Sequence, residues 1–510
     1  MRSLALALAL GAFAPTASAD LLVLKDGRVI QDQKLARSDG GIAIQYANGD
    51  VLVPTALVED VIIDGEATPP PATAEEQEMA GKGLVRWEGK WIPKKRRDEL
   101  LAKRTAERKK EVEEIAAHRE WAKRRTAKTK HFAFEYTVPQ GVFENYAALM
   151  EAYFDAFVKD WGLQAPKNLG QLPVCLHIDY DAMVQVGGAG NGVLGYFRFV
   201  RPWDLNFFHD RTDPAFTEEV MFHETNHYLQ KLLDLEFAMP HFPGESLAEY
   251  YGASHWDPVK KKLSTGLLLE GRLCELKLDL QRGEWIGLEQ LVSTDRMYEH
   301  YNWGWSLVYF LMKDPRYQKK FQKFVATLPS GKGIQREVMG VDNLKTVSGA
   351  EVWKTFKAEL GLKDAAAVTA LEKEWHEFVD KKLQLESYRG LETAARQASN
   401  NGQPIKAKRL FKEAIERGST NPLTFHGYAE LLARDGEHDQ AIELWRKALA
   451  IDPLNAECYA AMGRSLLARG DKKEASRLRR LARDIDPDNS WFLFTDEDLE
   501  EIGTDDPPKK

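Results

Sequence analysis

Residues 422–455 determine the fold at the C-terminal end, and they read PLTFHGYAELLARDGEHDQAIELWRKALAIDPLN. Small and turn-forming residues of this stretch recur at a spacing of 34 in the neighbouring sequence. The recurring sets are Asn421, Asn455 and Asn489; Gly402, Gly436 and Gly470; Ala407, Ala441 and Ala475; and Ala414, Ala448 and Ala482, with Pro453 and Pro487 closing two units. Small residues in such a register lie where paired helices cross, so the pattern predicts three helix pairs over about residues 388–490.

This register resembles the tetratricopeptide repeat, which implies an all-α solenoid. Such arrays generally bind a peptide or a protein partner in their concave face, so the resemblance implies a protein partner here. An alternative stays open, because an array this short could also act as a rigid cap that only packs on the preceding domain.

The composition of the whole chain limits the function classes. A length of 510 residues corresponds to about three domains. The net charge is −8, from 70 Lys and Arg against 78 Asp and Glu, so the chain as a whole is not built to coat nucleic acid. A mean hydropathy of −0.44 argues against a multi-span membrane protein. The three cysteines Cys175, Cys274 and Cys458 are too few and too far apart for a disulfide scaffold or a CxxC metal site.

The first 19 residues have the layout of a cleaved secretory signal. Arg2 precedes the apolar run 4–13, and Ala17-Ser18-Ala19 forms a small-residue cleavage site before Asp20. The apolar run is shorter than the roughly 18–20 residues that span a bilayer. We therefore expect cleavage after Ala19 and an exported chain, periplasmic or extracellular, with no transmembrane segment; a retained N-terminal anchor is the alternative.

The middle of the chain divides by composition. Residues 20–64 predict a small antiparallel β-barrel with a hairpin turn at Asn48-Gly49. Residues 65–93, which contain Pro69-Pro70-Pro71, predict a linker. Residues 94–130 hold 15 Lys and Arg against 7 Asp and Glu and predict a charged connecting helix, either solvated or in contact with an anionic surface. Residues 131–385 predict an α+β domain, and residues 491–510 a tail.

One motif in the α+β domain carries chemistry, His223-Glu224-Thr225-Asn226-His227. Asp213 can cap, and Pro214 can begin, a helix that continues through Leu233. His223 and His227 are then one turn apart on the same helix face, a spacing that suits Zn²⁺, and Glu224 can reach a water molecule beside the metal.

A third ligand is available in Pro243-Gly244-Glu245-Ser246-Leu247-Ala248-Glu249-Tyr250. Together the two motifs resemble the gluzincin metallopeptidases, whose third zinc ligand is the first Glu of a W-x-x-E-G-x-A-x-Y-like segment on the next helix. The resemblance implies a zincin-like fold for residues 131–385, with Glu245 as third ligand and Glu249 as the carboxylate that orients a zinc-binding histidine. The sequence departs from that pattern at Phe242, near the usual tryptophan, and at Ser246, which replaces the glycine.

Tyr301-Asn302-Trp303-Gly304 resembles the Y-E-K-G segment of the aminopeptidases in the same clan. The resemblance implies that Tyr301 stabilises the oxyanion, with a core aromatic role or a substitute role for His300 as alternatives. The strand expected at 205–209, directly before the helix of His223, suits the edge strand along which zincin-type peptidases align a substrate.

These features predict an exported zinc-dependent peptidase in which zinc is held by His223, His227 and Glu245, with Glu224 as general base. We find no counterpart of the G-A-M-E-N segment that anchors a free amino terminus, which favours an endopeptidase. The arrangement most resembles exported bacterial proteins of the peptidase-MA-like superfamily, in which a gluzincin domain precedes tetratricopeptide repeats. Two alternatives remain, a non-catalytic scaffold and a zinc amidase that acts on cell-wall peptides.

Overall fold

The computed structural model describes residues 20–487 apart from 27, 32, 64–72, 88, 167, 168, 191, 211, 212, 385 and 386. The predicted signal peptide, most of the Pro-rich stretch and the predicted tail lie outside the described residues. Every helix in the described part is too short or too polar to cross a bilayer. The described residues form two compact units, one from within 1–110 and 421–510 and the other from within 111–420.

The N-terminal module consists of two separate antiparallel sheets rather than the predicted closed barrel. One has the order β2-β1-β6 and the other β3-β4-β5. The strands are β1 (Leu21–Leu24), β2 (Val29–Gln31), β3 (Lys34–Ser38), β4 (Gly41–Tyr46), β5 (Gly49–Pro54) and β6 (Val58–Ile62). The predicted hairpin is present, but Tyr46 pairs with Gly49, so its loop is Ala47-Asn48, and Gly49 takes a φ of +145° as the first strand residue.

The described residues between 73 and 93 form a helix and a hairpin, so the predicted linker extends too far. Thr73 and Glu76 form a reciprocal capping box that begins α1 (Ala74–Gly81). A hairpin of β7 (Leu84–Trp87) and β8 (Lys90–Pro93) follows directly. The composition of this stretch resembles a linker because neither element buries a residue deeply.

The charged helix α2 (Lys94–Ala117) ends 13 residues before the predicted boundary at 130. Arg104 pairs with Asp60 of β6 at 2.9 Å and Arg108 pairs with Glu59 at 2.6 Å, so part of its positive charge binds the N-terminal module. The rest of the predicted helix contains a 3-10 turn (Trp121–Lys123) and strand β9 (Arg125–Lys128), which joins the next domain's sheet.

A five-stranded sheet of order β12-β13-β11-β10-β9 forms the base of the second unit. Its further strands are β10 (Phe132–Tyr136), β11 (Leu172–His177), β12 (Gly195–Phe197) and β13 (Leu205–Phe208), interrupted by α3 (Gln140–Trp161) and α4 (Tyr180–Gly187). β10, β11 and β13 are parallel, and the outer strands β9 and β12 are antiparallel. β12 is therefore an edge strand, whereas the predicted edge strand at 205–209 is paired on both sides.

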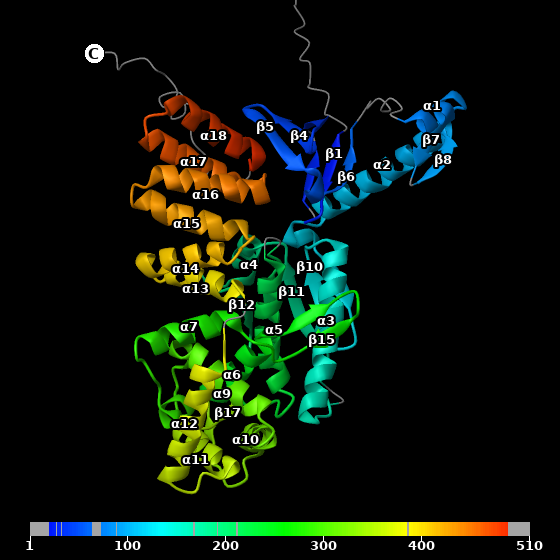
Figure 1. Cartoon of the computed structure of the whole chain (residues 1–510). Helices are drawn as coiled ribbons and strands as arrows, with labels where there is room; N and C mark the ends of the chain where they lie inside the picture. The colour runs from blue at the N-terminus through cyan, green and yellow to red at the C-terminus, as the bar shows by residue number, and fades with distance from the viewer. Residues whose placement is uncertain are drawn as a thin grey trace, which may run out of the picture. The chain divides into compact units, whose positions relative to one another are not determined.

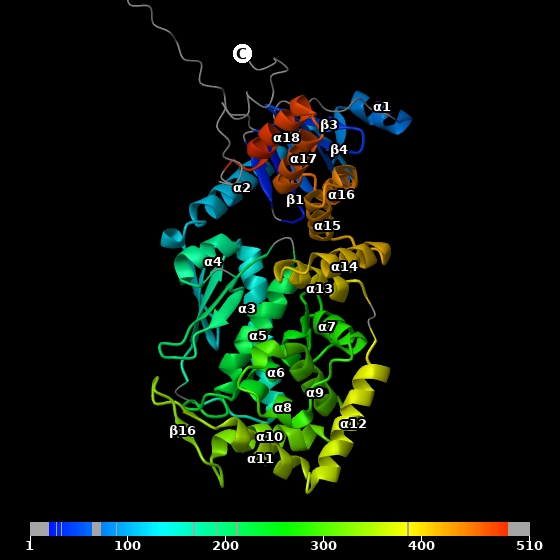
Figure 2. The same cartoon turned by 90° about the vertical axis from the view of Figure 1, so that its left-hand side faces the viewer.

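Helices cover one face of this sheet and continue beyond it (Figure 1). They and the short hairpins between them are α5 (Pro214–Gln230), α6 (His241–Gly252), β14 (His255–Asp257), β15 (Lys262–Ser264), α7 (Glu270–Gln281), α8 (Leu288–Val292), a 3-10 turn (Met297–Glu299), α9 (Tyr301–Lys313), α10 (Gln318–Ser330), β16 (Glu337–Val338), β17 (Lys345–Thr346), α11 (Gly349–Leu360) and α12 (Ala365–Lys381). The alternate residues Phe132, Phe134 and Tyr136 of β10 enter one continuous apolar core with residues of α3, α5, α6 and α9. Figure 2 shows α5, α6 and α9 close together in the middle of this unit.

The three predicted helix pairs are present. They are α13 (Arg389–Asn400) with α14 (Pro404–Glu416), α15 (Pro422–Arg434) with α16 (His438–Ile451), and α17 (Ala456–Ala468) with α18 (Lys472–Ile485). Ala407, Ala441 and Ala475 are fully buried, as the 34-residue register requires. Asn421 and Asn455 cap α15 and α17 with their side chains, whereas Asn489 lies outside the described residues. The first pair belongs to the second unit, and the other two belong to the unit that contains the N-terminal module.

Within the first unit, the N-terminal module binds the last two helix pairs. Arg28 pairs with Asp452 at 2.6 Å. The backbone N and the Nδ2 of Asn48 donate to Asp484 of α18 at 2.9 and 2.8 Å. Arg477 Nη1 donates to the carbonyl of Asn48 at 3.3 Å. The hairpin loop between β4 and β5 is thus bonded to the outermost helix of the repeats.

Candidate metal centre

Helix α5 presents the two histidines of the HExxH motif. Asp213 accepts from the backbone N of Phe216 at 3.2 Å, and Pro214 occupies the first turn, so the helix begins where the sequence predicts. It ends at Gln230, three residues before the predicted end. The His223 and His227 rings project from the same face, and their Nε2 atoms lie 3.3 Å apart.

Helix α6 brings Glu245 to the two histidines. Gln230 of α5 donates through Nε2 to the carbonyl of Gly244 at 2.8 Å, which connects α5 to α6 next to Glu245. Ser246, where the resembled family has glycine, faces Gly304 of α9; a Cβ on Gly304 would lie 2.3 Å from Ser246 Oγ. Because Gly304 has no side chain, the Ser246 side chain fits where α6 and α9 cross.

The three donor atoms form a nearly equilateral triangle. Glu245 Oε2 lies 3.4 Å from His223 Nε2 and 3.5 Å from His227 Nε2, and the two nitrogens are 3.3 Å apart. Ligands at about 2.0–2.2 Å from a tetrahedral zinc ion are separated by about 3.3–3.6 Å, so the triangle fits one face of that tetrahedron. Among the described residues this is the one group of His, Cys, Asp and Glu with such mutual distances.

Charge interactions within the triangle are strong. Burial alone would raise the pKa of Glu245, but the two histidines outweigh it and hold that pKa well below its usual range. Burial alone would lower the pKa of His223, but the hydrogen bond to Glu245 and the charges of Glu224, Glu249 and Glu245 raise it to about 9. The three side chains remain 17–25% exposed, so the site is reachable from solvent.

Glu224, the residue after His223 on α5, contacts the edge of the sheet. Its Oε2 accepts from the backbone N of Phe197 in β12 at 2.9 Å. Because Tyr196 pairs with Asn206 and Arg198 N donates to Asp204, the N–H of Phe197 lies on the edge of β12 that is not paired with β13. Gly195 lets α5 approach this strand, since a Cβ there would lie 2.6 Å from Val220 Cγ1.

Glu249 and Arg272 lie behind His223. Glu249 Oε1 is 3.4 Å from His223 Nδ1, which places the carboxylate where the resemblance implies. Arg272 of α7 holds both oxygens of Glu249, through Nε at 2.7 Å and Nη2 at 2.9 Å. Burial alone would lower the pKa of Arg272, but Glu249 and Glu275 outweigh burial and raise that pKa above its usual range. Sequence reasoning missed Arg272, because an arginine in a charged helix carries no motif.

Tyr301 lies beside His223 of the donor triangle. The ring of Tyr301 is edge-on to that of His223, with the ring centroids 6.4 Å apart. Burial and the charges of Glu245 and Glu249 raise the pKa of Tyr301 well above its usual range, so its hydroxyl stays protonated and can donate. The charges that act on His300 are instead those of Glu299, Asp279 and Arg296.

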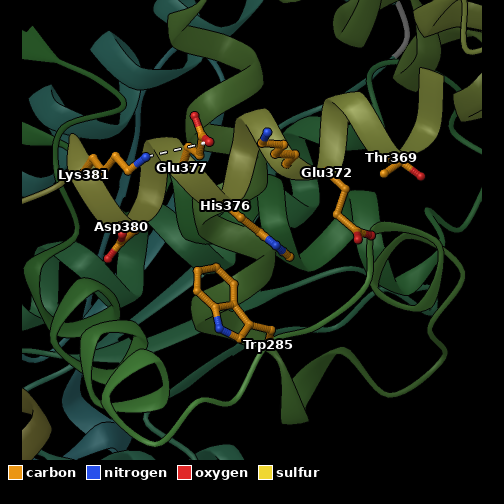
Figure 3. Close-up of a pocket in the computed structure, with 8 residues that line it drawn as sticks. Trp285, Thr369, Glu372, His376, Glu377, Asp380 and Lys381 are labelled. Carbon is orange, nitrogen blue, oxygen red and sulfur yellow. Dashed lines mark ion pairs between the residues drawn. The ribbon is translucent and has the colours of Figure 1, made fainter. Parts of the chain in front are cut away.

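A separate hollow of about 330 Å³ lies on α12 (Figure 3). The His376 ring lies 4.5 Å from that of Trp285, and its Nε2 is 3.1 Å from the carbonyl of Ile286. Lys381 and Glu377 form an ion pair along the rim. Residues of the predicted metal centre do not line this hollow, and its charges are mixed, so it adds nothing to the candidate centre.

Comparisons with known proteins match the repeats. A family model described as tetratricopeptide repeat matches residues 432–491. Small glutamine-rich tetratricopeptide repeat-containing protein 2 of Mycosarcoma maydis is 30% identical over 95 residues, which cover 19% of this chain and 26% of that protein. The match thus spans about a quarter of that relative's length. Tetratricopeptide repeats are present at the C-terminal end of the chain.

Two solved structures illustrate the extent of the structural matches. The TPR domain of Arabidopsis OM64 is 23% identical, with a TM-score of 0.22, and the match covers 23% of this chain and 96% of that domain. The Sgt2 TPR domain from Aspergillus fumigatus is 18% identical, with a TM-score of 0.21, and the match covers 24% of this chain and 86% of that domain.

Proposed function

We propose that this chain is a zinc-dependent peptidase of the gluzincin type. The observation that carries the proposal is the donor triangle of His223, His227 and Glu245, together with Glu224, whose carboxylate bonds to the outer edge of β12. A purely structural zinc site needs no additional carboxylate directed at a strand edge. The mixed sheet with its antiparallel edge strand β12 supports the zincin-like fold that the sequence resemblance implies.

His223, His227 and Glu245 would hold the zinc ion. When bound, zinc supplies Lewis-acid chemistry, polarising a substrate carbonyl and bringing the pKa of water near neutrality. Glu224 takes a proton from the attacking water as the new C–O bond forms at the carbonyl carbon. When the C–N bond breaks, Glu224 returns that proton to the leaving amine. Tyr301 donates a hydrogen bond to the oxyanion of the tetrahedral intermediate.

An extended peptide is the substrate that fits this edge. Gly195 and Phe197 face the side of β12 that is not paired with β13, and Glu224 takes the N–H of Phe197. A substrate that displaces this bond can pair with β12 as an added strand. The peptide would then lie along β12 with one of its carbonyls near Glu224. As the sequence analysis favours, we propose an endopeptidase that acts outside the cytoplasm, with the tetratricopeptide repeats binding a peptide or protein partner.

Replacement of Glu224 by Gln tests the proposal, because it keeps the side-chain volume and removes the base. Purified Glu224→Gln should keep its bound zinc and its fold, and lose about two to four orders of magnitude in cleavage rate on a peptide library. His227→Ala should instead lose most of its zinc. Full zinc occupancy in His227→Ala would contradict the ligand assignment.

A binding scaffold is the second candidate, and the family match of the repeats favours it. A scaffold predicts that wild type and Glu224→Gln cleave no substrate and bind a partner equally well. Wild-type protein that holds zinc yet is inert on unfolded proteins, peptide libraries and cell-wall peptides would support this second candidate. Cleavage of wall peptides alone would instead indicate the amidase.

A further inference from the structure

Arg272 of α7 connects the candidate metal centre, Tyr301 and the first repeat. Its guanidinium makes a bidentate pair with Glu249, and Nη1 donates to Glu275 Oε2 at 3.3 Å. Its Cζ lies 5.0 Å from the centroid of the Tyr301 ring. The Arg272 side chain is 19% exposed and that of Glu249 is 5% exposed, so the pair lies inside the domain.

This arrangement fixes the orientation of Glu249. A planar guanidinium that holds both carboxylate oxygens defines the plane of the carboxylate as well as its position. Glu249 Oε1 in turn faces Nδ1 of His223, and the bond at one ring nitrogen of a metal-binding histidine fixes the tautomer and direction of the other. The same guanidinium lies against the Tyr301 ring, so one side chain supports two residues of the centre.

The first repeat supports Arg272 from the other side. Helix α13 packs closely on α7, since a Cβ on Gly390 would lie 2.4 Å from the carbonyl O of Glu270 and one on Gly271 would lie 2.9 Å from Thr393 Cγ2. The carboxamide of Gln397 lies between Arg272 and Glu275, and we assign its amide orientation from these two partners, which makes its oxygen an acceptor 3.1 Å from Arg272 Nη1. Figure 2 shows α13 next to α7.

A second contact joins α13 to the helix of the histidines. Arg396 pairs with Asp213, the residue that caps α5, at 3.3 Å, and its guanidinium lies 5.7 Å from the Phe216 ring centroid. Helix α13 thus touches both α5 and α7. Arg396 and Gln397, the side chains that make these contacts, are bonded to residues of the metal domain.

We propose that Arg272 is a positioning residue for His223, through Glu249, and for Tyr301, and that helix α13 of the first repeat holds Arg272 in place. The inference rests on the proposed function for the identity of the metal. It assigns the first repeat to the support of the metal centre, and it leaves peptide binding by the repeats to the later helix pairs.

The test measures zinc affinity rather than cleavage. Arg272→Gln removes the bidentate pair, Arg272→Lys keeps the charge without it, and Gln397→Leu removes the support from α13. Arg316→Gln is the matched control, because Arg316 also lies between two carboxylates, Asp314 and Glu374, that are not part of the centre. Each full-length variant is titrated with zinc against a chelator, and its cobalt-substituted form gives a visible absorption spectrum that reports ligand geometry.

Arg272→Gln should bind zinc about 10–100-fold more weakly than wild type and should shift the cobalt spectrum. Arg272→Lys and Gln397→Leu should show smaller losses in the same direction, and Arg316→Gln should match wild type. Wild-type zinc affinity with an unchanged cobalt spectrum in Arg272→Gln would overturn the inference. If that variant does not fold, wild-type affinity in Arg272→Lys would overturn it.

The outcomes separate this inference from the proposed function. Weakened zinc binding in the Arg272 variants of a chain that cleaves no peptide would contradict the peptidase and leave the positioning role in place. Peptide cleavage by wild type, with wild-type zinc affinity in the Arg272 variants, would support the peptidase and contradict the positioning role. A wild-type chain that binds no zinc would overturn the metal centre and the positioning role together.

Discussion

Tyr301 contributes no atom to the donor triangle, yet its ring lies beside His223 and under the guanidinium of Arg272. Burial keeps its hydroxyl protonated, because the charged phenolate would face Glu245 and Glu249. A protonated phenol in this position can donate to an oxyanion but cannot serve as a base. Its contribution should therefore appear in the chemical step and not in metal binding.

Tyr301→Phe should keep zinc and fold, and lower kcat about 10²–10³-fold with little change in KM, as expected for the loss of one oxyanion donor. Peptide cleavage kinetics and metal analysis on the same sample measure both quantities. Tyr298→Phe is the control, since Tyr298 lies three residues earlier and is 59% exposed. An unchanged kcat in Tyr301→Phe would remove the residue from the proposed mechanism.

The residues of the centre differ in how far sequence could predict them. His223, Glu224 and His227 follow from helical spacing alone, because i and i+4 side chains share a face wherever the helix lies. Glu245 required a resemblance, since its approach depends on the turn between α5 and α6. Arg272 could not be predicted, because it acts through a contact with Glu249, 23 residues away, that arises only when α6 and α7 both pack on α9.

At the scale of elements, the sequence also could not predict which strand forms the edge of the sheet. The 205–208 segment LNFF is buried throughout, and burial of successive residues indicates a strand covered on both faces. The edge strand β12 has three residues, too few for a clear alternation of polar and apolar positions. In the N-terminal module the hairpin at Asn48-Gly49 follows from local turn chemistry, whereas the division of the strands into two sheets depends on long-range pairing.

The packing of α5 on β12 can be tested at Gly195. Gly195→Val places a Cβ 2.6 Å from Val220 Cγ1, so α5 must move away from the strand. We expect a loss of about 1–3 kcal/mol in the free energy of unfolding and reduced peptide cleavage, with zinc still bound. Denaturant unfolding and activity assays measure these effects. Gly141→Ala, which adds a Cβ with no atom within 4 Å, should leave both unchanged, and a stable, fully active Gly195→Val would contradict the packing.

The repeats allow a similar test within one helix. Ala441 of α16 is fully buried, so Ala441→Arg forces a long charged side chain into a helix crossing and should unfold or strongly destabilise that helix pair. Ala450→Arg on the same helix is the control, because Ala450 is exposed. Circular dichroism melts and limited proteolysis compare the two variants. Equal melts would show that the register does not place Ala441 at the crossing.

At the scale of the whole molecule, the two ends of the described chain belong to one unit, and the contiguous residues 111–420 form the other. The first unit is held together by polar bonds over more than 400 residues of sequence, among them Arg28 with Asp452 and Asn48 with Asp484. The candidate metal centre lies entirely in the second unit. A ligand that binds one unit should therefore stabilise that unit preferentially.

This division predicts two separable thermal transitions. Asp452→Arg replaces the partner of Arg28 by a like charge, and should lower the melting temperature of the transition to which the N-terminal module and the last two helix pairs contribute. Zinc added to metal-free protein should raise the other transition only, because binding stabilises the unit that contains His223 and Glu245. Differential scanning calorimetry on the full chain measures both shifts.

Asp439→Arg is the control, since Asp439 is 78% exposed and pairs with Arg469 on the surface of the repeats. If zinc and Asp452→Arg moved the same transition by comparable amounts, the two units would unfold cooperatively, and the separation of the chain's ends from the metal domain would be wrong.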